Sequence, residues 1–547
     1  MEAWDVIIIG EDVAGMRAAI AAADSGVSTL ILTAGALGQG AGVPDSAGIA
    51  ASVGEDDGIA HREDTIRNGS WLCDQDIVKQ RCDSAVSIVA EMERWGLVLR
   101  RDENGLPQPQ SLSGHANPRV VGCGDSTRRD LHRLLQEQCI KRGIPRRTDT
   151  QVIELVTESN SVRGLIALDL QQGELVGMQA RAIIISGTSF TGAWTGIPGS
   201  GSAAALALRA GVSLKNMEFQ AWNPLFLKGT DLLLPSALLA CGASIRSSDG
   251  TTIDHTSTSL TDISQQTGTD AGAVLDARGM ARDSILWFAG TVEQVASRSG
   301  LDINSEVIPI ETRIECTLGG VPVDEEGRVI LGEWGLWLTG MYATGDVACS
   351  GLNGSDLVSG NRLLDALAGG MQSGAHAGTW ASEAALSDGE SVRQALRRNR
   401  DAMAQRLDSG QSSGVGVGSI SNSLTSTMSE FMGLNRSAAG LEQAAENIRE
   451  LADSVLNVLL HDSSPVMNNE LAQLIELEGL IELSSAAVAS AISRCESRGG
   501  HQREDYPEPN DGTNLQHTLV DSAGNISALQ VRQGKDEGWL IAPLSTQ

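Results

Sequence analysis

The amino-terminal segment combines an apolar run, a glycine turn and an alanine-rich stretch, and this combination restricts the possible folds more than any other feature. Asp5–Ile9 predicts a buried strand, Val13–Ser25 a helix, and Ser28–Leu32 a second strand. A strand, helix and strand in this order open a parallel sheet. The sequence therefore predicts an α/β fold with a glycine turn placed to receive a dinucleotide.

The glycine turn departs from the dinucleotide-binding pattern Gly-x-Gly-x-x-Gly at one position. Gly10 and Gly15 supply its first and third glycines, whereas Asp12 stands at the second. A carboxylate there faces the pyrophosphate, and at ~4 Å with an effective dielectric of ~20 each such pair of charges repels by roughly 4 kcal/mol. The second strand ends at Thr33, where an acid usually binds the adenosine ribose. A turn that no longer binds nucleotide is therefore an open alternative.

After this strand, helix and strand, the composition and periodicity of the sequence change twice. Two further apolar strands, Arg181–Ser186 and Met341–Ala343, each run into a glycine. Between them Leu225–Cys316 is rich in Ser, Thr, Asp and Gly and predicts an inserted domain. Helical periodicity dominates the later part of the chain, with a Ser/Gly linker at Ser409–Ser423 and one long helix over Glu470–Cys495. The end of the chain is polar, with short strand-like pieces.

Composition narrows the class of protein. A chain of 547 residues should hold two or three domains. The net charge of −29 argues against nucleic-acid binding and against anionic membranes. The eight cysteines include no Cys-x-x-Cys pair, so we expect no metal or iron–sulfur site within the chain. No apolar run is long enough for a membrane span, and Val6–Ile9 is typical of a buried strand rather than a signal peptide, so we expect an intracellular protein.

Four segments resemble the flavoprotein subunit of the succinate dehydrogenase and fumarate reductase family, a superfamily shared with L-aspartate oxidase. Trp71–Asp76 is similar to its W-L-G-D-Q-D segment, and Met341–Cys349 resembles its second flavin motif, G-L-Y-A-A-G-E-V-A-C. Ala203–Phe219 is similar to its A-L-R-A-G-A…M-E-F run, and Glu496–Pro507 resembles its E-S-R-G-A-H-x-R-E-D-F-P. The matches occur in family order over most of the chain, so the chain is identified as a divergent member.

The resemblance implies a Rossmann-type FAD-binding domain with an inserted α+β capping domain and a C-terminal helical domain. We expect the FAD-binding domain at 1–224 and 317–385, the capping domain at 225–316, the helical domain at 386–507 and a tail at 508–547. In the family the cap closes a dicarboxylate beneath the flavin, hydride passes between flavin and substrate, and an Arg handles the proton.

Most positions that contact the substrate in that family carry other residues here. The two substrate His positions are Asn223 and Glu315, and the main substrate Arg position is Leu357. Because a carboxylate repels a dicarboxylate, Glu315 reverses the sign of its position. Arg282, in Ala281-Arg282-Asp283-Ser284, is the one retained catalytic candidate, although an Arg–Asp pair also suits a helix start. The three positions of the family's proton relay carry Ser236, Leu239 and Cys241.

The resemblance also implies the cofactor contacts. Arg362 stands at a family Ser beside the flavin, where we expect a displaced surface or cofactor contact, with entry into the substrate pocket as the alternative. The segment at which many members attach FAD covalently contains no His around Gly40–Pro44, so any FAD should be non-covalent. The expected cofactor-binding residues are Gly10, Gly15, Thr33, Gly187, Gly345, Asp346, Asn361, Arg362 and Leu363.

Three functions remain open. The first is an active FAD-dependent succinate or fumarate oxidoreductase subunit that passes electrons to an iron–sulfur subunit. The second, which the replacements favour, is a degenerate homologue that keeps the fold and pairs with an iron–sulfur subunit or a paralogous flavoprotein. The third is a flavoenzyme with a different substrate, for example a cationic one. In each case we expect a cytoplasmic chain, with no direct membrane insertion, that can lie peripheral to a membrane complex.

Overall fold

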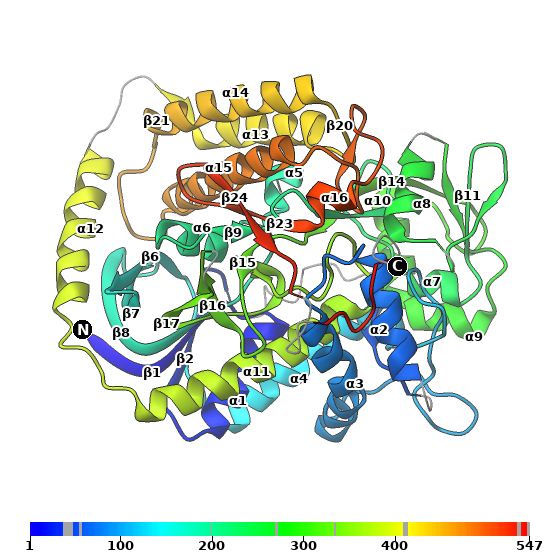
Figure 1. The fold of residues 1–547 in the computed structure, drawn as a ribbon, viewed down its shortest axis with the longest axis horizontal. Helices are drawn as coiled ribbons and strands as arrows, with labels where there is room; N and C mark the ends of the chain where they lie inside the picture. The colour runs from blue at the N-terminus through cyan, green and yellow to red at the C-terminus, as the bar shows by residue number, and fades with distance from the viewer. Residues whose placement is uncertain are drawn as a thin grey trace.

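The computed structural model describes residues 1–36, 47–53, 57–196, 199–256, 258–268, 272–332, 335–408, 414–532 and 538–543. Its centre is an eight-stranded sheet in the order β16-β17-β7-β8-β1-β2-β5, with β6 pairing with β7 (Figure 1). The strands are β1 (Glu2–Ile9), β2 (Thr29–Leu32), β5 (Arg146–Arg147), β6 (Thr150–Glu158), β7 (Ser161–Asp169), β8 (Glu174–Ile185), β16 (Arg328–Leu331) and β17 (Leu336–Ala343).

The centre of this sheet is parallel and buried on both faces. β1 pairs in parallel with β2 and with β8, and Ile7 lies between Leu30 and Ile183 in the register. Val6 and Ile8 pack toward one core and Ile7 and Ile9 toward another. Strands covered on both faces have continuous apolar runs, which is why these segments could be identified from the sequence.

One face of the sheet carries the helices that surround the glycine turn. α1 crosses α11 closely, since a Cβ atom at Gly370 would lie 2.5 Å from the Ala14 carbonyl oxygen and one at Gly374 would lie 2.1 Å from that of Ala18. Figure 1 shows α1, α3, α4 and α11 together on this side. The helices are α1 (Val13–Asp24), α2 (Asp57–Asn68), α3 (Gln75–Trp95), α4 (Thr127–Lys141) and α11 (Asn361–Glu383).

A second sheet of five strands, in the order β10-β14-β13-β11-β12, is built from the segment between β8 and β16. Four helices accompany it, and its core includes Leu238, Phe288 and Ile308. Its strands are β10 (Gln220–Leu227), β11 (Ser244–Arg246), β12 (Thr252–Ile253), β13 (Val274–Asp276) and β14 (Ile308–Thr317). Its helices are α7 (Ala237–Ala240), α8 (Leu260–Gly268), α9 (Arg282–Ile285) and α10 (Ala289–Ser299).

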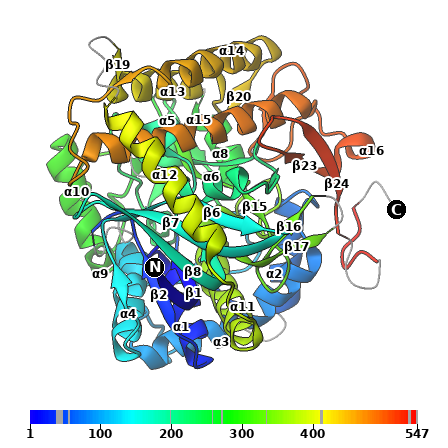
Figure 2. The same ribbon diagram turned by 90° about the vertical axis from the view of Figure 1, so that its left-hand side faces the viewer.

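The later part of the chain is helical, and α13, α14 and α15 share a core with Ile7 of β1. α12 lies across β7 and β8 (Figure 2), where Val392 and Ile166 belong to a separate core. The helices are α12 (Glu390–Asp408), α13 (Val417–Phe431), α14 (Ala438–Val455) and α15 (Asn469–Ser493). The long helix over Glu470–Cys495 is thus confirmed.

The Ser/Gly linker expected at Ser409–Ser423 is wrong for its second half. α13 begins at Val417, and Val417 and Ile420 are buried. The apolar residues Val417, Ile420 and Leu424 recur at helical spacing and are buried in the core, so packing overrides the weak helix propensity of the intervening Ser and Gly residues.

After the helices the chain returns to the first domain. β23 (Gln516–Val520) pairs with β24 (Ile526–Gln530) and with β9 (Leu214–Lys215) in an antiparallel sheet. No helix within the described ranges combines the length and apolarity needed to cross a membrane. The remaining short elements are β3 (Ile49–Ala50), β4 (Val120–Val121), β15 (Val321–Pro322), β18 (Ala348–Cys349), β19 (Val415–Gly416), β20 (Asn435–Arg436), β21 (Val458–Leu459), β22 (Gln502–Arg503), α5 (Gly192–Thr195), α6 (Ser202–Arg209) and α16 (Asp511–Asn514).

Candidate functional site

A cavity of about 650 Å³ opens at the carboxyl ends of β1 and β2. Gly10, Thr33 and Gly187, three of the residues expected to bind a cofactor, line it. A Cβ atom added at Gly187 would meet no atom within 4 Å. Ligands of parallel sheets bind in this place, outside the carboxyl ends of the strands. The cavity is therefore the candidate nucleotide site.

Asp12 is the residue of the turn that departs from the dinucleotide pattern, and it does not turn outward. Its Oδ1 accepts hydrogen bonds from the Gly15 backbone N–H at 2.7 Å and from the Ser186 hydroxyl at 2.5 Å, so it caps α1. A helix N-terminus attracts anions, and the carboxylate holds the position that this fold offers to phosphate. Burial, with the nearby Asp346 carboxylate, raises the pKa of Asp12, which favours the neutral form that does not repel phosphate.

The adenosine end of the cavity has the hydrogen-bonding groups that a nucleotide needs. Thr33 lines it as predicted. Gln151 is 3% exposed, and its Oε1 is a buried acceptor without a partner within the described part of the chain. Since an orphaned acceptor is costly, a ligand with a donor satisfies it. In shape and in chemistry these residues fit the adenosine and pyrophosphate part of FAD.

Residues at two of the altered substrate positions bind each other instead. Asn223 of β10 donates from Nδ2 to Glu315 Oε2 of β14 at 2.7 Å. Arg362, at the start of α11, lies 3.6 Å from Glu315 Oε1 and donates to Asp346 at 2.9 and 2.5 Å. We call Asn223, Glu315, Asp346 and Arg362 the pocket network. Two of the three altered substrate positions, Asn223 and Glu315, thus contact each other.

The charges of the pocket network stabilise one another. Although burial alone would lower the pKa of the Arg362 guanidinium, Asp346 and Glu315 raise it well above its ordinary value. Burial works to raise the pKa of Asp346, but Arg362 outweighs it and lowers that pKa. The sign reversal at Glu315 is therefore compensated by Arg362. The expectation of a surface contact for Arg362 is wrong, because the residue is 7% exposed. Arg362 contacts Asp346 and Glu315 instead, and its contact with the cofactor stays a prediction.

The position of the family's main substrate Arg is apolar in three dimensions as well as in sequence. Leu357 is buried in a cluster with Phe219, Cys316 and Leu318. Beside it Asp356 accepts from the Thr261 hydroxyl of α8 at 2.8 Å, and burial raises the pKa of Asp356 to about 7. The three relay positions, Ser236, Leu239 and Cys241, lie on or beside α7, and Leu239 is buried there.

Arg282 is not brought to the pocket network. It begins α9, in which no residue is buried, and its own side chain is exposed. Two of the expected cofactor residues on α11 also have partners or packing elsewhere. Asn361 Oδ1 lies 2.9 Å from His61 Nε2 while its Nδ2 donates to Thr65, and Leu363 is buried against the sheet. Gly345 has a φ of 73° in the turn that carries Asp346. The segment around Gly40–Pro44 lies outside the described residues.

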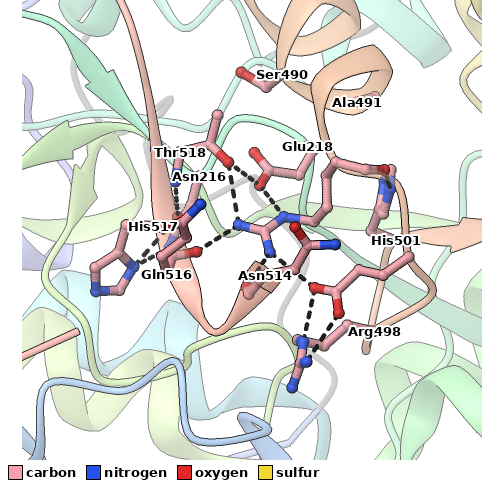
Figure 3. Close-up of polar contacts among 12 residues, drawn as sticks. Asn216, Glu218, Ser490, Ala491, Arg498, His501, Asn514, Gln516, His517 and Thr518 are labelled. Atoms are coloured by element: carbon pink, nitrogen blue, oxygen red, sulfur yellow. Dashed lines mark hydrogen bonds and ion pairs between the residues drawn. The ribbon is translucent and has the colours of Figure 1, made fainter. Parts of the chain in front are cut away.

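The retained motifs form a separate set of buried ion pairs. Arg494, at the end of α15, donates to Glu218 Oε1 at 2.6 Å and to Glu496 Oε1 at 2.8 Å, and Arg498 donates to the other oxygen of Glu496 at 2.8 Å. The Arg494 guanidinium also donates to the Gln516 carbonyl oxygen and to the Thr518 hydroxyl, and Figure 3 labels Glu218, Gln516 and Thr518, the partners of these bonds. We call Glu218, Arg494, Glu496 and Arg498 the motif junction. It ties the M-E-F run to the C-terminal motif.

Arg436 is a further residue of this region that the sequence did not reveal. It is 1% exposed, donates to the Glu218 carbonyl oxygen at 2.8 Å, and lies 2.8 Å from His501 Nδ1. Burial lowers the pKa of Arg436 to about 9. A single Arg between two helices gives no sequence signal, because its role depends on segments far along the chain.

Comparison with protein families gives two matches. The family described as FAD binding domain matches residues 5–363, and the family described as fumarate reductase flavoprotein C-term matches residues 421–540. The first match covers well over half of the chain and indicates FAD as the cofactor.

Individual relatives extend over nearly the whole chain. A succinate dehydrogenase flavoprotein subunit of Rickettsia felis is 25% identical over 564 residues, covering 96% of this chain and 94% of the relative. A fumarate reductase flavoprotein subunit of Mycobacterium tuberculosis is 28% identical over 556 residues, covering 94% of each. Among solved structures, E. coli quinol fumarate reductase superposes with a TM-score of 0.88 at 24% identity and covers 98% of both chains. That last likeness concerns the fold.

Proposed function

Because the chain belongs to the family of succinate dehydrogenase and fumarate reductase flavoproteins, we propose that it is a subunit that binds FAD non-covalently but has lost or greatly weakened dicarboxylate chemistry. Its role is then structural or that of a partner subunit. The pocket network is the observation that carries this proposal. A family member needs cationic or donor groups directed at both substrate carboxylates, and here such groups are bound to the protein's own acids.

The residues of the pocket network work against a dicarboxylate in three ways. The Arg362 guanidinium is engaged by Asp346 and Glu315, so a substrate carboxylate must compete with two carboxylates already in place. Glu315 adds a negative charge at a former His position. Leu357 offers no hydrogen bond where the family has its main Arg. Removing one partner of a buried charged contact typically costs 2–5 kcal/mol, and the family has several such contacts here.

FAD, when bound, supplies the acceptor and donor of hydride. This chain's own residues hold it through Gly10, Thr33 and Gly187 at the nucleotide cavity. The turn at Gly345 and Asp346 and the start of α11 complete the expected contacts. No residue of the pocket network is placed to deliver a proton, because Arg362 is held fully charged by its neighbours.

Binding to a partner subunit explains why the chain keeps the family's fold although it lacks the family's substrate contacts. The relatives are flavoprotein subunits by name, and we extend this to the present chain as an iron–sulfur or paralogous flavoprotein partner. The retained motif junction supports this view, because it preserves the packing of the C-terminal helices and tail while the pocket changes. From the same similarity to flavoprotein subunits we expect the chain to lie peripheral to a membrane complex.

The two enzyme alternatives find less support. An active dicarboxylate oxidoreductase relies on Arg282, which is exposed at the start of α9. A cationic substrate would need a carboxylate open to it, whereas Glu315 is occupied by Asn223 and Arg362.

One experiment tests the proposal. The purified chain is loaded with FAD, photoreduced without oxygen and mixed with fumarate, while the flavin absorbance is followed. We expect flavin absorbance on purification and no recovery of the oxidised band beyond a buffer control. Fumarate-dependent reoxidation in many turnovers would overturn the loss of chemistry. A folded, colourless chain that binds no added FAD would overturn the cofactor assignment instead.

A further inference from the structure

The nucleotide cavity has a second wall that the strand-and-turn pattern does not include. α15 of the helical region contributes Gln473, Glu476, Leu477 and Leu480, spaced so that they share one face of the helix. The cavity therefore lies between the ends of β1 and β2 and a helix that lies more than 400 residues later in the chain. Its lining includes three acids, namely Glu11, Asp12 and Glu476.

Two of these three acids are already satisfied. Glu11 accepts from Arg146 at 2.8 Å and from Gln136 at 3.1 Å, and Asp12 caps α1. The half-buried Glu476 carboxyl, in contrast, has no hydrogen bond or ion pair to any residue that the structure describes, and burial raises its pKa. A carboxyl that loses part of its hydration without gaining a partner is unfavourable, so its presence beside a ligand cavity calls for a ligand donor.

Gln151 places a second unpartnered acceptor next to the same helix. Its Nε2 donates to the Ala472 carbonyl oxygen at 3.2 Å, one turn before Glu476 along α15, and this leaves the buried Oε1 orphaned. Adenosine carries donors in its two ribose hydroxyls and its exocyclic amine. Two unsatisfied acceptors on the wall therefore match the donors of the nucleotide that this fold receives.

We propose that Glu476 is a cofactor-binding residue that accepts hydrogen bonds from the adenosine ribose hydroxyls of FAD. It takes over the role of the acid that the second strand lacks at Thr33. The recognition of adenosine is thereby moved from the end of β2 to α15, and it depends on the helical region being docked. The inference rests on FAD being the cofactor of the cavity.

The test is the FAD affinity of the full-length apoprotein, measured by quenching of flavin fluorescence. The variant is Glu476→Ala, and the matched control is Glu478→Gln, which lies on the same helix but pairs with Arg406 outside the cavity. A hydrogen bond to a charged acceptor is worth about tenfold or more in affinity, so Glu476→Ala should weaken FAD binding by at least that factor while the control remains unchanged. Thr33→Glu added to Glu476→Ala should recover part of the loss.

A second measurement alters the cofactor. FAD that carries 2′-deoxyadenosine should bind the unaltered chain more weakly than FAD, and should bind Glu476→Ala as well as FAD does. Equal affinity of Glu476→Ala and the unaltered chain for FAD, or an undiminished preference of Glu476→Ala for FAD over the deoxy analogue, would overturn the inference. An unaltered chain that binds no FAD would overturn it together with the cofactor assignment.

Discussion

The motif junction and the pocket network are both sets of buried ion pairs, yet they have opposite relations to the family. The motif junction contains Glu218, Glu496 and Arg498 of the retained motifs, and Glu218 and Arg494 lie 2.6 Å apart and are nearly inaccessible to solvent. The pocket network replaces the family's residues, and the positive charge of Arg362 lies beside the negative charge of Glu315. The first fixes how the ends of the chain pack. The second joins Asn223 and Glu315, which stand at the family's two substrate His positions, to Arg362.

This difference shows which residues carry the resemblance. The segments that resemble the family most, M-E-F and E-S-R-G, form contacts between distant parts of the chain rather than contacts with a substrate. Whole-chain similarity therefore reports the fold and the cofactor cavity, and the chemistry must be judged at the pocket itself. The two networks should respond differently to substitution, as the following variants test.

Glu218→Ala should give the largest effect, because it leaves Arg494 with one carboxylate fewer in a fully buried place. Breaking a buried pair by removing one partner costs about 3–5 kcal/mol, and we expect a loss at the upper end of that range in chemical unfolding. The control is Glu482→Gln on α15, the helix that Arg494 follows. It removes only the exposed pair with Arg209 and should change the free energy of unfolding by less than about 0.5 kcal/mol. Equal effects of the two would mean that the junction is not a structural element.

Arg362→Met tests whether the pocket network also stabilises the fold. It leaves Asp346 and Glu315 without their cation, so we expect a loss of about 3 kcal/mol in the free energy of unfolding. Adding Glu315→Gln should recover part of this loss, since one of the two carboxylates that lost the Arg362 cation is then neutral. If the two substitutions add without coupling in a double-mutant cycle, the network is not a unit.

Asp356→Asn should stabilise the chain in a pH-dependent manner. Burial raises the pKa of Asp356 to about 7, so the folded state holds the proton more tightly than the unfolded state does, and stability falls as the pH rises from about 4 to about 7. The variant should match the unaltered chain near pH 4, be more stable by about 2 kcal/mol at pH 5.5, and gain further as the pH rises to 7. Thermal unfolding of both proteins across this pH range measures the difference in stability. A difference that is the same at every pH would contradict the raised pKa of Asp356.

Asp12→Asn should have the smallest effect, and on the cofactor rather than on the fold, because Asn also caps a helix. Protonation of Asp12 removes its repulsion of the pyrophosphate, so FAD affinity of the unaltered chain should rise as the pH falls through the raised pKa of this residue. The variant should bind FAD about tenfold more tightly at pH values above the raised pKa of Asp12 and lose this part of the pH dependence. If Asp12→Asn binds FAD more tightly but its FAD affinity keeps the same pH dependence, a group other than Asp12 titrates.

The sequence predicted the fold class and the glycine turn because their signals are local. Continuous apolar runs at β1 and β2, and the helical spacing over Glu470–Cys495, identify their elements without knowledge of the rest of the chain. Thr33 lines the cavity as the pattern of the second strand requires. The linker at Ser409–Ser423 was misjudged in its second half, because burial of Val417 and Ile420 decides the helix there and burial is not a local property.

The compensation within the site could not be predicted from one sequence. Glu315 and Arg362 lie 47 positions apart and on different elements, and each by itself is only a departure from the family pattern. The contribution of α15 to the nucleotide cavity depends on how the helical region docks on the sheet. Charge pairing between such positions follows from the tertiary structure, which a motif comparison does not contain.

The central claim is that the pocket network excludes a dicarboxylate from the flavin. The most direct test is a titration of the FAD-loaded chain with succinate, fumarate and malonate, followed by the flavin difference spectrum, which reports binding whether or not turnover occurs. We predict no saturable spectral change at millimolar concentrations of any of the three. A saturable change that Arg362→Met abolishes would contradict the claim, because it would mean that Arg362 serves a substrate carboxylate rather than Asp346 and Glu315.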